Sequence, residues 1–529
     1  MLHLSFKKTD DKERRKMILS GNLWRTILMI IFPLAIYQLF NSFYTLFDQV
    51  ICAQISTDAQ NAVSAISQIK NTISAFGGGL AAGGAVIVSR YFGAGEIKHA
   101  RNASSNLFFM SIVMSILLCA LFIPLAIPIM KLCQIADSSI AIGVGFFQLQ
   151  LLELSFVSLN SVFIGLEKAK GNSRLILWLN VGVLIIKLGL TCLFVFAFQL
   201  KDIVFVELAT IIAQACLTAI GLFILFRKSN ILRLSFRMLR PRKIYVLKIL
   251  KLSIPIFLGK FVMSLGKVVV NAICGGFWNE VTDGLIVGTL GVSNNICGLI
   301  TSPTNSFEEG ESTIVSQNLG NKNIRRSMKT FVRTLILVTG VSLLGWVLLR
   351  FVLIDNIVEL FTSADQKSDI YKNMVKEIFR FDSLSIISLG ITAAVLGLLY
   401  GFGQTGLSTV LNLSRIGSRI IFLVTIHAIS PDLSPTLCAG LSMGISNAVI
   451  LFLAILFLVI FIFKIKKKGY QGMRFSDPEP EVSELKFDDD NKNNINSNEE
   501  NITNNIENNT EETIQIDDSE AVIENNVTN

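Results

Sequence analysis

The chain has 529 residues, of which 51% are apolar and only 16% are charged. A soluble globular protein carries roughly 25% charged residues, and a soluble α/β core has short apolar runs instead of runs of twenty or more. The composition therefore excludes a water-soluble domain and indicates a polytopic membrane protein. The formal charge of +8 combines an acidic end, with 16 Asp and Glu against 2 Lys from Phe475 onward, and a basic body. That body needs no nucleic acid as a partner, because lysines and arginines in short loops set the orientation of membrane helices.

Twelve apolar stretches follow in chain order, each long enough to cross about 30 Å of hydrocarbon as a helix. They lie at 24–50, 61–88, 104–130, 138–165, 174–198, 203–226, 245–276, 284–317, 331–354, 371–400, 407–429 and 436–463. We predict an all-α polytopic membrane protein with twelve transmembrane helices in two pseudo-symmetric six-helix bundles. The predicted parts are a cytosolic basic arm (1–23), an N-lobe (24–226), a cytosolic linker (227–244), a C-lobe (245–463) and a disordered acidic cytosolic tail (464–529).

The basic residues alternate between connections. Those after the second, fourth, sixth and eighth stretches are rich in Lys and Arg, and the intervening ones are poor or balanced by acids. Because such residues are retained in the cytoplasm, both termini are predicted to be cytoplasmic. The tail is rich in Asn and acids and has too little apolar surface to order itself.

One phrase occurs twice, Val-Ser-x-x-x-Gly, at 88–93 and at 315–320, an offset of 227 residues. Pro33 and Pro255 answer each other in the first stretch of each half, and Gly171-Asn172-Ser173 and Gly403-Gln404-Thr405 follow the fourth stretches. These echoes predict a duplicated architecture with a parallel repeat. The two prolines are expected to bend their helices, because proline removes a backbone donor.

Ionisable residues inside apolar stretches are costly, at least about 2.5–3.5 kcal/mol each, and must face a wet cavity or each other. In the first half they are Asp48, Lys70, Glu153 and Lys187; in the second they are Lys260, Lys267, Glu308, Glu309, Glu311, Arg380 and Asp382. Helical spacing allows the two span-7 lysines to meet the span-8 glutamates, as a structural pin or as a functional site. Asp48 is either a solvated residue at a helix end or a carboxylate that takes up a coupling proton.

Other chemistries lack their motifs. There is no P-loop, no H-E-x-x-H and no C-x-x-C, and the eight cysteines are scattered through apolar stretches. We therefore expect no cofactor, no bound metal and no enzyme, and a membrane-embedded enzyme or receptor is the remote alternative.

The assembled motifs resemble the multidrug and toxic compound extrusion (MATE) family of secondary transporters. The matching pieces run from Phe32-Pro33-Leu34 and Phe47-Asp48, through Val88 to Gly95, Gly165 to Ser173 and Leu208 to Gln214, to Ile254-Pro255, Val315 to Gly320 and Tyr400 to Thr405. The resemblance implies alternating access and export of organic cations or other amphipathic drugs, toxins or metabolites, driven by protons or Na⁺. It implies a small-molecule substrate, a bilayer and a monomer. A flippase for lipid-linked oligosaccharides is the alternative.

The resemblance also implies a coupling site in the N-lobe, where Asp48, Asn180 and Thr210 match the family pattern. Leu184 stands where that pattern has a second Asp, and Lys187 lies three residues further on. A nearby lysine disfavours Na⁺, so protons are favoured as the coupling ion. The other family pattern, a Glu in span 7 and an Asp in span 10, is not matched, since span 7 offers lysines and Asp382 comes about two turns early.

Overall fold

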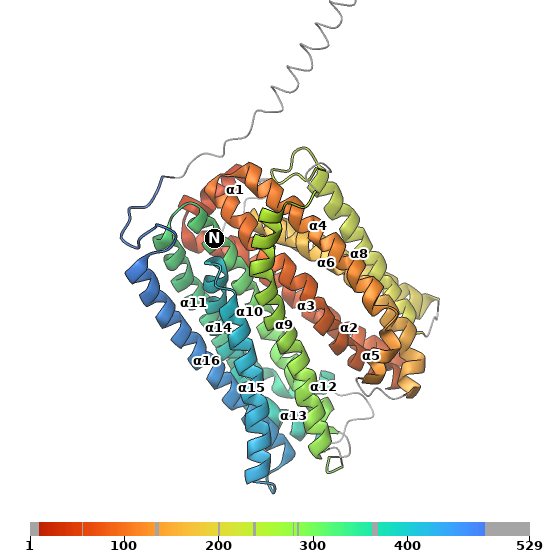
Figure 1. The fold of residues 1–529 in the computed structure, drawn as a ribbon. Coiled ribbons are helices and arrows are strands. Elements are labelled where there is room, and N and C mark those ends of the chain that lie inside the picture. Colours follow the sequence, from red (N-terminus) through yellow and green to blue (C-terminus); the bar gives the residue numbers. More distant parts are fainter. Residues whose placement is uncertain are drawn as a thin grey trace, which may run out of the picture. The chain divides into compact units, whose positions relative to one another are not determined.

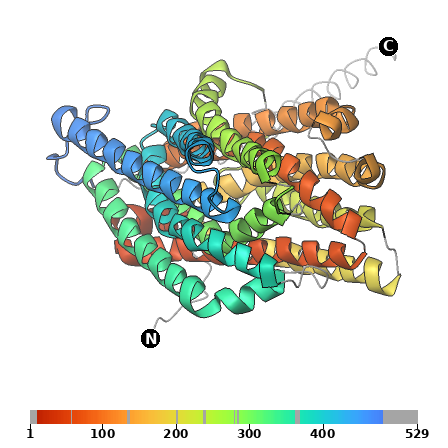
Figure 2. The same ribbon diagram turned by 90° about the horizontal axis from the view of Figure 1, so that it is seen from below.

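The computed structural model describes residues 10–481, except 56, 133–136, 199–201, 236–239, 279, 283–284 and 362–368. In this part of the chain the regular elements are helices, and the only β pairing is one isolated bridge between Tyr470 and Met473. The helices up to α8 and those from α9 onward form two groups, drawn red to yellow and green to blue in Figures 1 and 2. The groups meet mainly where α3 packs on α9 and α10, and where α2 packs on α10.

The helix bounds follow the predicted order. The first group, the N-lobe, comprises α2 (Leu23–Ile55), α3 (Thr57–Ala94), α4 (Ile97–Phe122), α5 (Ala126–Leu132), α6 (Asp137–Ala169), α7 (Ser173–Cys192), the π-helical η1 (Leu193–Ala197) and α8 (Ile203–Phe226). The second group, the C-lobe, comprises α9 (Lys243–Trp278), α10 (Leu285–Gly320), α11 (Ile324–Val347), η3 (Leu348–Leu353), α12 (Ile354–Phe361), α13 (Asp369–Asp382), α14 (Leu384–Gly401), α15 (Gly406–Ile429) and α16 (Pro435–Lys468). A short helix, α1 (Asp11–Ser20), precedes them within the predicted basic arm.

Eleven helical segments of the described chain are long and apolar enough to cross a membrane, which makes this an integral multi-pass membrane protein. The twelfth predicted span is α9, a 36-residue helix that contains several lysines and is not among the eleven. Its crossing stays a prediction. The predicted span 371–400 is divided at Ser383 between α13 and α14.

The predicted tail begins too early. Helix α16 continues to Lys468, and after it Tyr470 donates a hydrogen bond from its hydroxyl to the carbonyl oxygen of Phe402 at 2.6 Å. Met473 is buried at 7% exposure, so apolar side chains hold residues 464–473 against the helices despite the basic run 466–468. Residues 482–529 lie outside the described part of the chain.

The duplication is visible in how corresponding helices end. Gly95 and Lys322, 227 residues apart, both adopt positive φ, at 84° and 59°. Gly171 and Gly403, after α6 and α14, do the same at 76° and 79°. At all four ends the next residue's N–H bonds five residues back, as in Glu96 to Tyr91 and Asn323 to Asn318, which is the Schellman arrangement. The sequence echoes are therefore matching helix stops.

Each lobe has an apolar core of its own. One cluster lies wholly in the N-lobe, around Phe147 and Leu151, and two lie in the C-lobe, around Leu290 and Phe379. A further cluster joins the lobes beside α1, with Ile30 and Val86 from one side and Val315 and Leu399 from the other. The lobes are thus separate folding cores that share packing at one end. We call this the basic end, because the lysine- and arginine-rich connections lie there.

Candidate functional site

The two Val-Ser-x-x-x-Gly phrases end α3 and α10 and pack directly against each other at the basic end. The Cα of Gly93 faces the backbone of Gln317, and that of Gly320 faces the carbonyl oxygen of Arg90, so closely that a Cβ at either glycine would clash. Arg90 and Gln317 are themselves 227 residues apart, so the contact is reciprocal. The phrases are therefore the crossing point of the two lobes, and glycine is needed because backbone meets backbone.

A second reciprocal pair surrounds this crossing. In the N-lobe, Nδ1 of His99 lies 2.8 Å from the hydroxyl of Tyr245 at the start of α9. In the C-lobe, Nε of Arg326 donates to the carbonyl oxygen of Ile18, just before α2, at 3.0 Å. Both the donors and the recipients differ by 227 in number. Each lobe thus holds the first helix of the other.

Helix α1 connects the two phrases. Arg15 donates from Nε to the carbonyl oxygen of Phe92 at 3.0 Å and from Nη2 to that of Gly93 at 2.9 Å. Arg326 adds a bond to the carbonyl oxygen of Gly21 at 2.6 Å. Burial lowers the pKa of the Arg15 guanidinium, which lies outside the apolar spans. These bonds satisfy carbonyl groups that a helix end leaves without partners.

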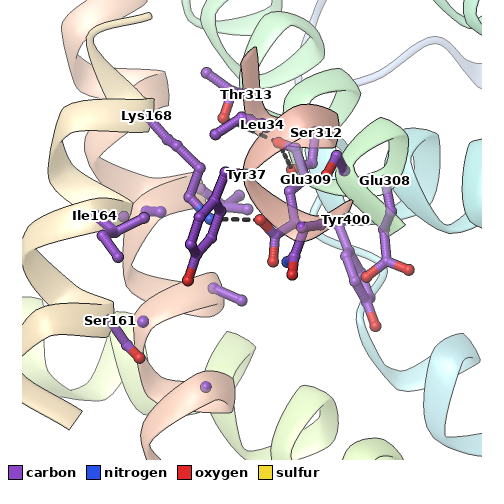
Figure 3. A pocket seen from close by; sticks show the side chains of 18 of the residues that line it. Leu34, Tyr37, Ser161, Ile164, Lys168, Glu308, Glu309, Ser312, Thr313 and Tyr400 are labelled. Atoms are coloured by element: carbon purple, nitrogen blue, oxygen red, sulfur yellow. Dashed lines mark hydrogen bonds and ion pairs between the residues drawn. The ribbon is translucent and has the colours of Figure 1, made fainter. Parts of the chain in front are cut away.

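Beneath the crossing lies a small cavity of about 160 Å³ whose polar side chains come from both lobes (Figure 3). Lys168 of α6 points across it and its Nζ lies 2.6 Å from Oε2 of Glu309 on α10, with Tyr37 close by. Nearby, Nε2 of Gln317 donates to the carbonyl oxygen of Ala169 at 2.7 Å. We call Lys168, Lys260, Glu308, Glu309 and Glu311 the seam group.

Glu311 is the most confined member of the seam group. Its residue has 0% exposure, and neither carboxyl oxygen has a hydrogen-bond partner in the described structure. An ionised carboxylate buried without a donor is strongly disfavoured. This position therefore suits a side chain that carries a proton while α10 and α14 stay packed.

The larger cavity, about 570 Å³, opens between α2 and the C-lobe. From α2 it receives Gln38, Asn41 and Ser42, and most of its other lining comes from the C-lobe. Lys267 and Arg415 line it on one side, and Asp382 accepts from Oγ of Ser293 at 3.4 Å and from Sγ of Cys297 at 3.5 Å. Lys260, Glu308 and Glu309 line it as well, so it reaches the seam group.

The N-lobe holds a charged cluster of its own. Lys70 of α3 forms an ion pair with Glu153 of α6, and its Nζ lies 3.9 Å from Oε1 of Glu207 on α8. Lys187 of α7 is buried and interacts electrostatically with Glu207. Four helices thus contribute one charge each to a balanced cluster of two cations and two anions.

Three of the four N-lobe residues predicted from the family pattern meet in one pocket. Asn180, Lys187 and Thr210 line a cavity of about 50 Å³ together with Leu184. Asp48 belongs to α2, but its side chain lies outside the described part of the structure. Pro33 and Pro255 lie inside α2 and α9, as predicted, and the bends expected of them stay a prediction.

The predicted network between spans 7 and 8 is only partly assembled. Lys260 and Glu308 line the same cavity, but no ion pair joins either span-7 lysine to the three glutamates in the described chain. Glu309 pairs across the seam with Lys168, and Lys267 lies with Arg415 and Asp382. Seven residues along a helix cover about 10.5 Å, so two lysines on one face reach different surroundings.

Sequence reasoning missed three buried charges, Glu207, Arg415 and Arg419. All lie inside predicted apolar spans, so the cost of burying a charge was the available signal. Arg415 and Arg419 are 8% and 3% exposed and lie one turn apart on α15.

The fold and these sites define a helical membrane transporter built from two similar lobes. The model of the MatE family matches residues 33–193 and 255–425, once in each half and together over more than half of the chain, so the chain belongs to the MATE family. Members of this family are transporters and not enzymes.

Relatives and solved structures agree with this assignment. The chain is 22% identical over 326 residues to multidrug export protein MepA of Staphylococcus aureus (strain MSSA476), covering 61% of this chain and 69% of the relative. The fold is similar to an outward-facing multidrug resistance MATE family transporter, with a TM-score of 0.77, 16% identity and coverage of 85% and 98%. It is also similar to a MOP superfamily transporter of Pyrococcus furiosus, described as having a binding pocket of reverse polarity that suggests a different function, at TM-score 0.78, 16% identity and coverage of 85% and 98%.

Proposed function

We propose that this protein is a secondary active antiporter that exports amphipathic organic compounds, organic cations among them, in exchange for protons. The observation that carries the proposal is the pairing of a closed crossing with an open cavity. The two lobes meet backbone to backbone at Gly93 and Gly320, while a cavity of about 570 Å³ lies between α2 and the C-lobe. With the basic end and both termini in the cytoplasm, the cavity serves the outside and is the release state of an exporter.

The contacts across the seam suit a reversible switch. They include one ion pair, Lys168–Glu309, and hydrogen bonds such as Arg90 Nη2 to the carbonyl oxygen of Gly401 at 2.9 Å. Because each lobe keeps its own apolar core, these contacts can separate while both lobes stay folded. Alternating access then needs only a rocking of one lobe against the other.

Coupling requires groups whose pairing depends on bound protons. Lys70, Glu153 and Glu207 come from three different helices, so a proton on either carboxyl removes one tie between helices. Asp48, on α2 beside the cavity-lining Gln38, Asn41 and Ser42 in sequence, is the further proposed carrier, ionised in the loaded state and protonated from outside on release. By linkage, substrate must weaken proton binding by the same factor. Lys187 in the N-lobe pocket favours protons over Na⁺ as the driving ion.

The test is export of a fluorescent amphipath by purified protein in proteoliposomes, with proton and Na⁺ gradients imposed separately. We expect a proton gradient alone to drive export, and Asp48→Asn to abolish it while Asp202→Asn, at the N-cap of α8, leaves it intact. Export driven only by Na⁺ would overturn the choice of ion, and normal export by Asp48→Asn would remove that residue from the mechanism.

One observation favours a second candidate. A flippase for lipid-linked oligosaccharides needs a cationic cavity, and Lys260, Lys267 and Arg415 line this one. Movement of a labelled lipid headgroup between leaflets, without export of soluble dye, would support the flippase and contradict antiport.

A further inference from the structure

Three cations gather in the C-lobe around a single carboxylate. Lys267 on α9 interacts electrostatically with Arg415 and Arg419 on α15 and with Asp382 on α13. In the described chain none of the three cations has a carboxylate within the 4 Å of an ion pair. We call Lys267, Arg415 and Arg419 the cationic group.

The two arginines are held by neutral partners that leave their charge uncompensated. Nε of Arg415 donates to Oδ1 of Asn447 at 3.1 Å, and Nε of Arg419 donates to Oγ of Ser446 at 3.1 Å. These bonds orient the guanidinium groups without neutralising them. An arginine buried to 8% or 3% exposure beside another cation is costly unless an anion joins it.

The cationic group faces the cavity and not the lipid. Lys267 and Arg415 both line it, and the Lys267 side chain is exposed there. Apolar side chains continue the lining, among them Met263, Leu299, Leu389 and Leu396. At the opposite side, the seam group carries three glutamates against two lysines, so the cavity is positive only at its C-lobe end.

We propose that the cationic group binds the anionic group of an amphipathic organic anion, such as a carboxylate on an aromatic or aliphatic skeleton, whose apolar part lies along the adjoining cavity wall. This inference rests on the proposed export function and narrows its substrate class. Arginine matches carboxylate geometry with paired N–H donors, and Lys267 supplies a point charge from the opposite helix. An organic cation, in contrast, would meet three like charges at this end.

The test uses two probes that share one fluorophore, dansylglycine as the anion and dansylcadaverine as the cation. Binding of each is measured by fluorescence titration of the purified full-length protein in phosphatidylcholine nanodiscs. We expect saturable dansylglycine binding that Lys267→Gln weakens about tenfold, since a hydrogen bond to a charged group is worth roughly 1.5–3 kcal/mol. Binding of dansylcadaverine should not weaken.

Matched variants separate a binding role from a structural one. Arg415→Lys keeps the charge and should retain more dansylglycine binding than Arg415→Gln, while Arg240→Gln, on an exposed connection, should change nothing. The Lys267 side chain has no recorded hydrogen bond, so Lys267→Gln tests the proposal even if the Arg415 variants fold poorly.

The outcomes distinguish the two proposals. If dansylcadaverine alone binds, the anion inference fails and the export function stands. If neither probe binds, both fail. Equal loss of both probes in Lys267→Gln would also overturn the anion inference. Nanodiscs containing phosphatidylglycerol distinguish a solute from a lipid headgroup, because loss of dansylglycine binding only there would assign the cationic group to the lipid.

Discussion

In the N-lobe, Lys70 pairs with Glu153 and lies near Glu207, and Lys187 balances the second glutamate. In the C-lobe, Lys267, Arg415 and Arg419 surround only Asp382. The same two lobes match closely at the basic end, where the Gly93 and Gly320 contacts are reciprocal. A duplicated chain has therefore kept its crossing symmetrical while its buried charges have diverged. The symmetrical part serves the conformational switch, and the asymmetrical part assigns proton coupling to one lobe and substrate binding to the other.

The largest expected effect tests whether the two charge groups differ in this way. Lys70→Met leaves Glu153 as a buried charge without its partner, which typically costs about 3–5 kcal/mol. Lys267→Met removes a cation that has like-charged neighbours and should cost less than about 1 kcal/mol or stabilise the protein. Thermal unfolding of both variants in the same detergent measures the difference.

A control and a contrary result are both available for this pair. The double variant Lys70→Met/Glu153→Met should recover most of the lost stability, because it removes the unpaired charge. Equal destabilisation by Lys70→Met and Lys267→Met would show that the C-lobe group is a hidden ion-pair network like that of the N-lobe.

The next effect concerns the symmetrical part. Gly93→Leu and Gly320→Leu should each reduce export severely, because overpacking typically costs about 1–3 kcal/mol and backbone atoms cannot turn aside. The two should act alike. Gly340→Leu on α11 is the matched control, since a Cβ there would meet nothing within 4 Å. Dye export and electron–electron distance measurements between the lobes would report the loss of the closed crossing; a harmless Gly93→Leu paired with a damaging Gly320→Leu would refute the reciprocal contact.

The symmetrical part was also the part that could be predicted from sequence. Matching phrases mark positions where a helix stops in the left-handed region or where two backbones touch, and few residues satisfy either demand. Gly95 and Gly171 could be read in this way, although Lys322 meets the same demand without being glycine. Helix existence followed equally well from the apolar runs.

Charge partners could not be predicted because they depend on which helices face each other. Lys168 lies at the end of α6, outside any predicted buried network, yet it meets Glu309 because α6 and α10 adjoin across the seam. Arg415 and Arg419 were likewise within reach as buried charges, but nothing along α15 indicates that α9 and α13 supply their neighbours. Spacing along one helix identifies a face, and only packing identifies what that face meets.

The smallest effect compares a buried Lys–Glu pair with an exposed one. Nζ of Lys329 lies 3.0 Å from Oε1 of Glu479, with side chains 53% and 45% exposed. The Lys329 hydrogen bond and the nearby Arg326 and Arg325 lower the pKa of Glu479, so its stabilising contribution is present above the ordinary glutamate pKa and is lost as pH falls through the lowered value.

An exposed pair contributes at most about 1 kcal/mol and is screened by salt. Glu479→Gln should therefore speed hydrogen exchange in the segment after α16 by no more than about fivefold at about pH 7, with little effect at about pH 3, where Glu479 is protonated. Glu481→Gln, an exposed acid two residues on, is the control and should change nothing. An effect of Glu479→Gln as large as that of Lys70→Met would mean that the segment after α16 carries stability comparable to the buried cluster, and the distinction drawn between interior and surface charges would not hold.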